Sequence, residues 1–120
     1  MAMKPRLNLI VLQSEDIFAL MNFYQALGLE FILEQHGSGP KHYSCVVSGV
    51  VFELYPGELS NSNIQVGFTV PSLDDTFLAL LKRCGGKIAK PPKESPQGGR
   101  VIVVRDPDGR KVRLVEVIDG

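Results

Sequence analysis

The sequence has 120 residues, of which 44% are hydrophobic and 22% charged, so it can bury one core but hardly two. Lys plus Arg equals Asp plus Glu at 13 each, which argues against a nucleic-acid binder with a broad basic face. No apolar run approaches the roughly 18 residues of a membrane-spanning helix, and we expect no signal peptide and no membrane partner. Cys45 and Cys84 are not spaced as metal ligands or as a redox-active pair usually are. We therefore expect two reduced thiols in a cytoplasmic protein.

The first half of the chain reads as a strand, a helix and three more strands. Residues 7–12 form an apolar strand, and the helix after it has apolar residues at helical spacing up to a terminating Gly28. Ser14 is the expected N-cap of this helix. Further strands are expected over residues 29–34, 43–47 and 50–55. Ser48-Gly49 between the last two predicts a tight hairpin.

The same order of elements starts again after a polar connector. Strands are expected over residues 64–70, 87–90, 100–105 and 110–118. Ser72 is the expected cap of the second helix, with Asp75 three residues on. Residues 91–99 are a loop rich in proline and glycine, and Asp106-Pro107-Asp108-Gly109 is a strong turn signal. Strand–helix–strand–strand–strand therefore occurs twice, which predicts an α+β fold.

Each half is a βαβββ module of one predicted domain over residues 1–120. Module one covers about residues 6–56, a linker about 57–63, and module two about 64–118. Helices this short need one face of a sheet to cover them, which leaves the opposite face for something else. We therefore expect a curved mixed-sheet cup with the helices on the outside.

The turn at Ser48-Gly49 fixes which residues of the first hairpin share a face. If Val47 pairs with Val50, then Ser44 lies opposite Glu53, and His42 lies opposite Tyr55. Because alternate residues share a face, these four side chains would face the cup. The other face is the more apolar and would face the helix. It carries Tyr43, Cys45, Val47, Phe52 and Leu54.

His42 and Glu53 become diagonal neighbours in this register. A carboxylate can orient a histidine ring and raise its basicity, so the pair suits general acid–base chemistry. Three interpretations stay open: a proton-transfer pair, a relocated metal site, and a partly solvated histidine at a pocket rim. His36, in its glycine-containing loop, is expected to be exposed.

Three stretches indicate a family. They are Phe23-Tyr24 with Leu27-Gly28-Leu29, Phe52-Glu53-Leu54, and Asp106-Pro107-Asp108-Gly109 with Val112-Arg113-Leu114. In this order the chain resembles the vicinal-oxygen-chelate superfamily of glyoxalase I, bleomycin-resistance proteins and extradiol dioxygenases. The resemblance implies paired βαβββ modules and four metal-ligand positions, one on the first and one on the last strand of each module. Those positions fall on Leu9 (or Asn8), Glu53, Gln65 and Arg113.

These four residues depart from the family's ligand pattern. Leucine has no donor atom, and arginine stays protonated and repels a divalent cation. We therefore expect the family's usual metal to be absent and no cofactor to be bound. Arg113 could instead pair with Glu53, because a carboxylate in an apolar cup needs a counter-charge, or it could grip an anionic ligand.

Two functions follow as expectations, and whether the protein is an enzyme is left open. The first is a binder of a small molecule in the cup, similar to the bleomycin-resistance branch and without the metal. Its expected ligand contacts are Leu9, Ser44, Tyr55, Gln65 and Arg113. The second is a metal-dependent lyase, isomerase or dioxygenase-like enzyme that uses Glu53 with Gln65 or His42. The resemblance also implies a homodimer, with the cup closed within one chain or across two.

Overall fold

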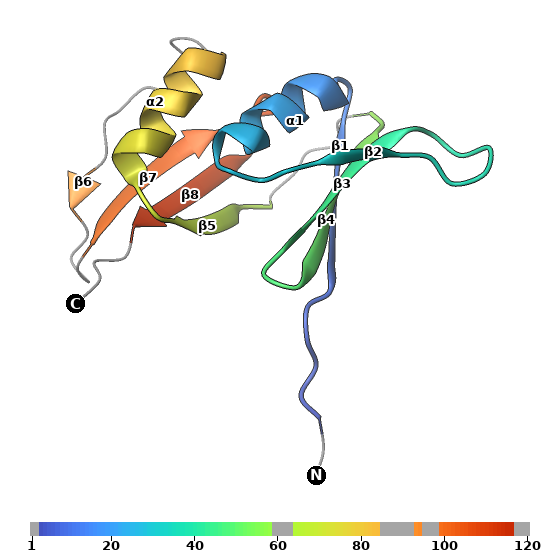
Figure 1. The fold of residues 1–120 in the computed structure, drawn as a ribbon, viewed down its shortest axis with the longest axis horizontal. Helices are drawn as coiled ribbons and strands as arrows, with labels where there is room; N and C mark the ends of the chain where they lie inside the picture. The colour runs from blue at the N-terminus through green and yellow to red at the C-terminus, as the bar shows by residue number, and fades with distance from the viewer. Residues whose placement is uncertain (1–2, 59–63, 85–92, 95–98, 117–120) are drawn as a thin grey trace.

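The computed structural model describes residues 3–58, 64–84, 93–94 and 99–116, which form two halves with the same order of elements (Figure 1). The first half contains β1 (Leu9–Ser14), α1 (Ile17–Ala26), β2 (Ile32–Glu34), β3 (His42–Val47) and β4 (Val50–Pro56). The second contains β5 (Val66–Val70), α2 (Leu73–Cys84), β6 (Lys93–Glu94), β7 (Arg100–Arg105) and β8 (Lys111–Glu116). The predicted α+β fold of two βαβββ modules is confirmed. Among the described helices, none is long and apolar enough to cross a bilayer.

Each half folds its strands into one mixed sheet. The strand orders are β1-β4-β3-β2 and β5-β8-β7-β6, with the first strand of each half parallel to the last and the other pairs antiparallel. The predicted hairpin register is confirmed, because Ser44 pairs with Glu53 and Val47 with Val50. Ser48 and Gly49 both have positive φ, 52° and 77°, as a two-residue turn matched to strand twist requires.

The two helices begin differently. Ser72 caps α2 as predicted, because its Oγ accepts a hydrogen bond from the Asp75 amide at 3.1 Å. The prediction that Ser14 caps α1 is wrong, because Asp16 is the N-cap and accepts from the Ala19 amide at 3.0 Å. Ser14 is instead the buried last residue of β1, and its hydroxyl accepts from the Asp16 amide and donates to Asp108.

Two strand predictions differ from the structure. β2 starts at Ile32 rather than at residue 29, because the chain first leaves α1 through Gly28 at a φ of 106°. β6 lies within the segment predicted as a loop, because residues 93–94 extend the antiparallel pairing along β7. The strand predicted over 87–90 and the predicted end of β8 at 117–118 lie outside the described residues.

The helix-facing sides of both sheets meet in one hydrophobic core. α1 packs against α2, and Tyr24 of α1 lies between Phe52 of β4 and Phe68 of β5, with ring centroids 5.2 and 6.0 Å away. Phe52 and Phe68 are themselves 6.0 Å apart across the two halves. Because these sides converge, the helix-free faces of the sheets point away from the shared core. Within one chain the two sheets are therefore open and not closed into a single cup (Figure 1).

A buried polar network also joins the halves. In the turn between β7 and β8, the Asp106 carboxylate accepts from the Tyr24 hydroxyl at 2.9 Å and from Arg110 Nη1 at 3.1 Å. Arg110 also donates to Asp108 at 3.1 Å and to the Gln13 carbonyl at 2.6 Å. Burial alone would lower the pKa of Arg110, but the hydrogen bonds and charges of Asp106 and Asp108 more than offset this and raise it. The turn after β7 is thus held against β1 and α1.

The Tyr24 hydroxyl should make folding stability sensitive to alkaline pH. Burial, and then the Asp106 carboxylate, raises the pKa of Tyr24 well above its ordinary value of 10.0. Above that ordinary value the unfolded chain releases a proton that the folded chain keeps, so the stability of the native state falls as pH rises. We expect wild type to lose more unfolding free energy than Tyr24→Phe between pH 9 and about 11 in urea titrations. Equal losses in the two proteins would contradict this role.

Candidate functional site

The helix-free face of the first sheet brings four of the predicted site residues together. His42 and Ser44 lie on β3, and Glu53 and Tyr55 lie on β4, all on the face opposite α1. Cys45, Phe52 and Leu54, which alternate with them, are buried in the core. The sheet therefore gathers a histidine, a serine, a carboxylate and a phenol in one place.

His42 is the centre of this group. Its side chain is only 1% exposed, and its ring stacks on that of Tyr55 with centroids 4.1 Å apart and planes 10° apart. Nε2 of His42 lies 3.5 Å from Glu53 Oε2 and 3.3 Å from the Tyr55 hydroxyl. Nδ1 lies 3.2 Å from the carbonyl of Pro40. Since a carbonyl only accepts, Nδ1 carries a proton and Nε2 points at the carboxylates.

Tyr55 keeps its hydroxyl proton at neutral pH. Desolvation, followed by the negative charges of Glu53 and Glu34, raises the pKa of Tyr55. The neutral phenol lies 3.3 Å from His42 Nε2, within hydrogen-bond distance of it. An imidazole whose Nε2 lies 3.5 Å from a carboxylate and 3.3 Å from a phenol can transfer or share a proton with a bound molecule.

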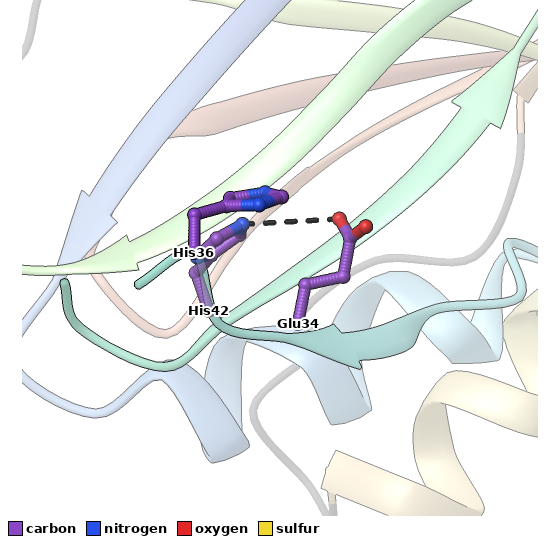
Figure 2. Close-up of side chains that lie close together, drawn as sticks. All are labelled: Glu34, His36 and His42. Carbon is purple, nitrogen blue, oxygen red and sulfur yellow. Dashed lines mark ion pairs between the residues drawn. The ribbon is translucent and has the colours of Figure 1, made fainter. Parts of the chain in front are cut away.

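Glu34 and His36 join this group, although no site role was predicted for them. Glu34 of β2 pairs with His42 of β3, and its Oε1 lies 3.8 Å from His42 Nε2 (Figure 2). His36 is exposed as predicted, but its ring lies over that of His42 with centroids 5.1 Å apart (Figure 2). The alternation of side chains along β2 could have placed Glu34 on this face. The position of His36 over His42, in contrast, depends on the shape of the loop between β2 and β3.

The other predicted positions lie apart from this group. Leu9 of β1 pairs with Val51 of β4 and shares the face of Glu53. Gln65 precedes β5, and Arg113 lies on β8 of the second sheet, both exposed. Gln65 lies two residues before the residue of β5 that pairs with Arg113. In the first sheet, Leu9 likewise lies two residues before the residue of β1 that pairs with Glu53. The two pairs occupy equivalent places in the two modules.

The predicted ion pair between Glu53 and Arg113 does not form within one chain. Across the described residues, the ion pairs do not include one between these two side chains. They lie on separate sheets, Glu53 on β4 of the first and Arg113 on β8 of the second. Glu53 has His42 as its partner instead. An ion pair across two chains stays a prediction.

Two hollows lie elsewhere on the molecule. One of about 770 Å³ opens between the halves, beside β5 and the end of α1, and includes Ile10, Phe52 and Phe68 in its walls. The other, of about 450 Å³, lies between the turn after β7, the middle of α1 and the C-terminal end of α2, beside Asn22, Arg83 and Asp106. Neither contains the His42 group.

Comparisons with known proteins agree with the fold described above, in which the order strand–helix–strand–strand–strand occurs twice. The sequence profile of the Glyoxalase/Bleomycin resistance protein/Dioxygenase superfamily matches residues 6–114. No curated protein sequence matches the chain. Among solved structures, a hypothetical protein from S. aureus is 20% identical with a TM-score of 0.71, and the match covers 98% of this chain and 100% of that one.

Two further solved structures share the fold. Lactoylglutathione lyase from Agrobacterium tumefaciens is 17% identical with a TM-score of 0.67, and the match covers 94% of each chain. A member of the same superfamily from Sphaerobacter thermophilus is 22% identical with a TM-score of 0.68, covering 96% of this chain and 99% of that one. At these identities the likeness concerns the fold.

Proposed function

Because the chain belongs to the Glyoxalase/Bleomycin resistance protein/Dioxygenase superfamily, we propose that its single domain binds a small molecule on the helix-free sheet faces, without a metal at the superfamily's four ligand positions. The observation that carries this proposal is the residue set at those positions. Leu9 and Arg113 supply no lone pair to a cation, and Arg113 adds a positive charge. Gln65 and Glu53 alone are two oxygen-bearing side chains, too few for a protein-built site. The residues present do not fit the metal there.

The cup is proposed to form between two chains. The helix-free face of the first sheet is rich in exposed apolar side chains, namely Leu9 at 48%, Val11 at 43%, Ile32 at 62% and Val46 at 69%. Apolar patches of this kind on a soluble protein mark binding surfaces. The second sheet of the same chain does not cover this apolar face. We therefore propose that the second sheet of a partner chain covers it, and a two-fold axis relating the two chains would close both cups at once.

Charge supports this pairing of unlike faces. The first sheet presents Glu34 and Glu53, whereas the second presents Arg105, Lys111 and Arg113 on neighbouring strands. Opposite charges across an interface fix its register and exclude wrong arrangements. In the proposed homodimer, Glu53 of one chain faces Arg113 of the other.

The ligand is proposed to be a small, partly apolar molecule with a polar or anionic group. Leu9 would contact its apolar part, and Ser44, Tyr55 and Gln65 would provide hydrogen bonds. Arg113 would hold a carboxylate or phosphate, whose geometry matches its guanidinium. We place the protein in the cytoplasm, where reduced thiols such as the buried Cys45 persist.

Catalysis is a second candidate function, favoured by the 3.5 Å distance between His42 and Glu53. This pair can accept a proton from a bound molecule and return it, as isomerases and lyases require. A binding protein needs no such pair, so turnover that is lost in Glu53→Gln with ligand binding retained would establish the enzyme.

A thermal-shift screen of small carboxylates, phosphates and aromatic metabolites tests the binding function. A compound that binds only the native state raises the melting temperature. We expect Arg113→Ala to abolish the shift of an anionic hit, whereas Lys82→Ala on exposed α2 should leave it unchanged. A hit whose shift survives Arg113→Ala and Tyr55→Phe, or a screen without hits, would contradict binding at these faces.

A further inference from the structure

Two histidines and a glutamate meet where β2 ends and β3 begins (Figure 2). One donor atom from each of Glu34, His36 and His42 lies within 4.8 Å of the other two. Imidazole nitrogens and carboxylate oxygens are the ligands that zinc and its neighbours in the first transition row take in proteins. We propose that these three residues bind one divalent transition-metal ion of the zinc type, a site distinct from the superfamily's four positions.

The spacing of the donors suits such an ion. Bonds of 2.0–2.1 Å in a tetrahedron place two donors about 3.3 Å apart. Glu34 Oε1 lies 3.8 Å from His42 Nε2, so closing this pair around an ion needs a shift of only about half an ångström. His36 is exposed on a loop and can follow without disturbing the core.

His42 is already oriented as a ligand. Its Nδ1 donates to the Pro40 carbonyl, so Nε2, which faces Glu34, is the nitrogen left to bind an ion. Histidines that bind metals use this arrangement, in which the second ring nitrogen donates to a carbonyl or carboxylate. Stacking on Tyr55 holds the plane of the ring, and the Tyr55 hydroxyl, 3.3 Å from Nε2, is the contact that an ion would replace.

The local sequence explains why the three donors converge. Glu34 and His42 pair across the β2–β3 ladder, so both point to the same face. The loop between them turns back on itself, because the Gly39 amide donates to the His36 carbonyl at 3.0 Å and Gly37 has a φ of 58°. That turn brings His36 over His42, and a metal ion would join the two ends of the loop.

Three protein ligands leave a fourth position to water or to a bound molecule, as in catalytic rather than structural zinc sites. Glu53 Oε2 lies 3.5 Å from His42 Nε2, and its negative charge favours a cation bound at that nitrogen. The metal site does not depend on ligand binding in the cup, although both use the same face of the first sheet.

Calorimetric titration of the chelator-treated full chain with Zn²⁺ tests the site. We expect one ion per chain, and a visible spectrum of the Co²⁺ form typical of four-coordinate geometry. His36→Ala and Glu34→Gln should weaken Zn²⁺ binding by at least the roughly 10–100-fold that loss of an outer partner of a ligand costs. Glu30→Gln, an exposed carboxylate outside the group, is the matched control and should bind as wild type does.

Because His36 is exposed, His36→Ala should fold normally even if a variant of the buried His42 does not. A loss of Zn²⁺ binding in His36→Ala therefore reports on the site and not on folding. Circular dichroism of each variant confirms this. Two results would overturn the proposal. One is the absence of Zn²⁺ and Co²⁺ binding to wild type. The other is equal affinity in wild type, His36→Ala and Glu34→Gln. The three side chains would then be neighbours on one sheet face without a metal-binding role.

Discussion

Replacing Arg110 with methionine should lower the free energy of unfolding by about 3–5 kcal/mol, the usual cost of removing one partner from a buried ion pair. The Arg110 side chain is 5% exposed, and that of Asp106 is fully buried. Without the guanidinium, the Asp106 carboxylate would stay buried with only the Tyr24 hydroxyl and the amides of Asp108 and Arg110 as donors. Methionine matches the arginine stem in length, so the loss is electrostatic rather than a cavity.

The effect should extend beyond the turn itself. Arg110 donates to the Gln13 carbonyl of β1, and Asp108 accepts from Ser14, so the network connects residues about 95 positions apart. Urea unfolding followed by circular dichroism measures the change, and Lys111→Met, an exposed neighbour, should change it by less than about 0.5 kcal/mol. A loss below about 1 kcal/mol in Arg110→Met would show that water replaces the arginine.

The parts of the fold that follow local rules could be predicted from the sequence. Ser48-Gly49 is a two-residue turn signal, and a turn of known length sets the register of both flanking strands. The face shared by His42, Ser44 and Glu53 followed from that register alone. Ser72 was likewise identified as a cap, because its partner amide lies only three residues away.

Contacts between distant residues could not be predicted in the same way. Ser14 looks like a helix cap next to Asp16, and only its contact with Asp108 explains why it is buried in β1 instead. Nothing near Tyr24 in the sequence indicates that its hydroxyl meets Asp106, 82 positions later. Such pairs depend on how the two modules pack, which the local pattern does not contain.

The group around His42 falls between these cases. Glu34 lies on its face through strand alternation, and extending the predicted register by one strand would have placed it there. His36 sits in a loop without a regular period, so its position over His42 depends on the backbone at Gly37 and Gly39. A residue on an irregular loop that joins a candidate site therefore escapes sequence patterns, even when another residue of the site is recognised.

Reversing the charge of Arg113 should separate the proposed homodimer. In Arg113→Glu, each of the two cups would hold two facing carboxylates, one from Glu53 and one from the new residue. A close charge pair contributes about 1.5 kcal/mol or more across an interface, and two-fold symmetry doubles the change to about 3 kcal/mol. That weakens the dimer about 100-fold or more, which sedimentation equilibrium measures directly.

The double variant Glu53→Arg with Arg113→Glu makes the test specific. It restores opposite charges in both cups, so its dimer affinity should recover to within about 10-fold of wild type if the two side chains face each other. Lys82→Glu, which makes the same charge change on exposed α2, should leave the dimer intact. A monomeric wild type would refute the shared cup. A dimer insensitive to Arg113→Glu would place the interface elsewhere, and the exposed apolar face of the first sheet would then need another partner.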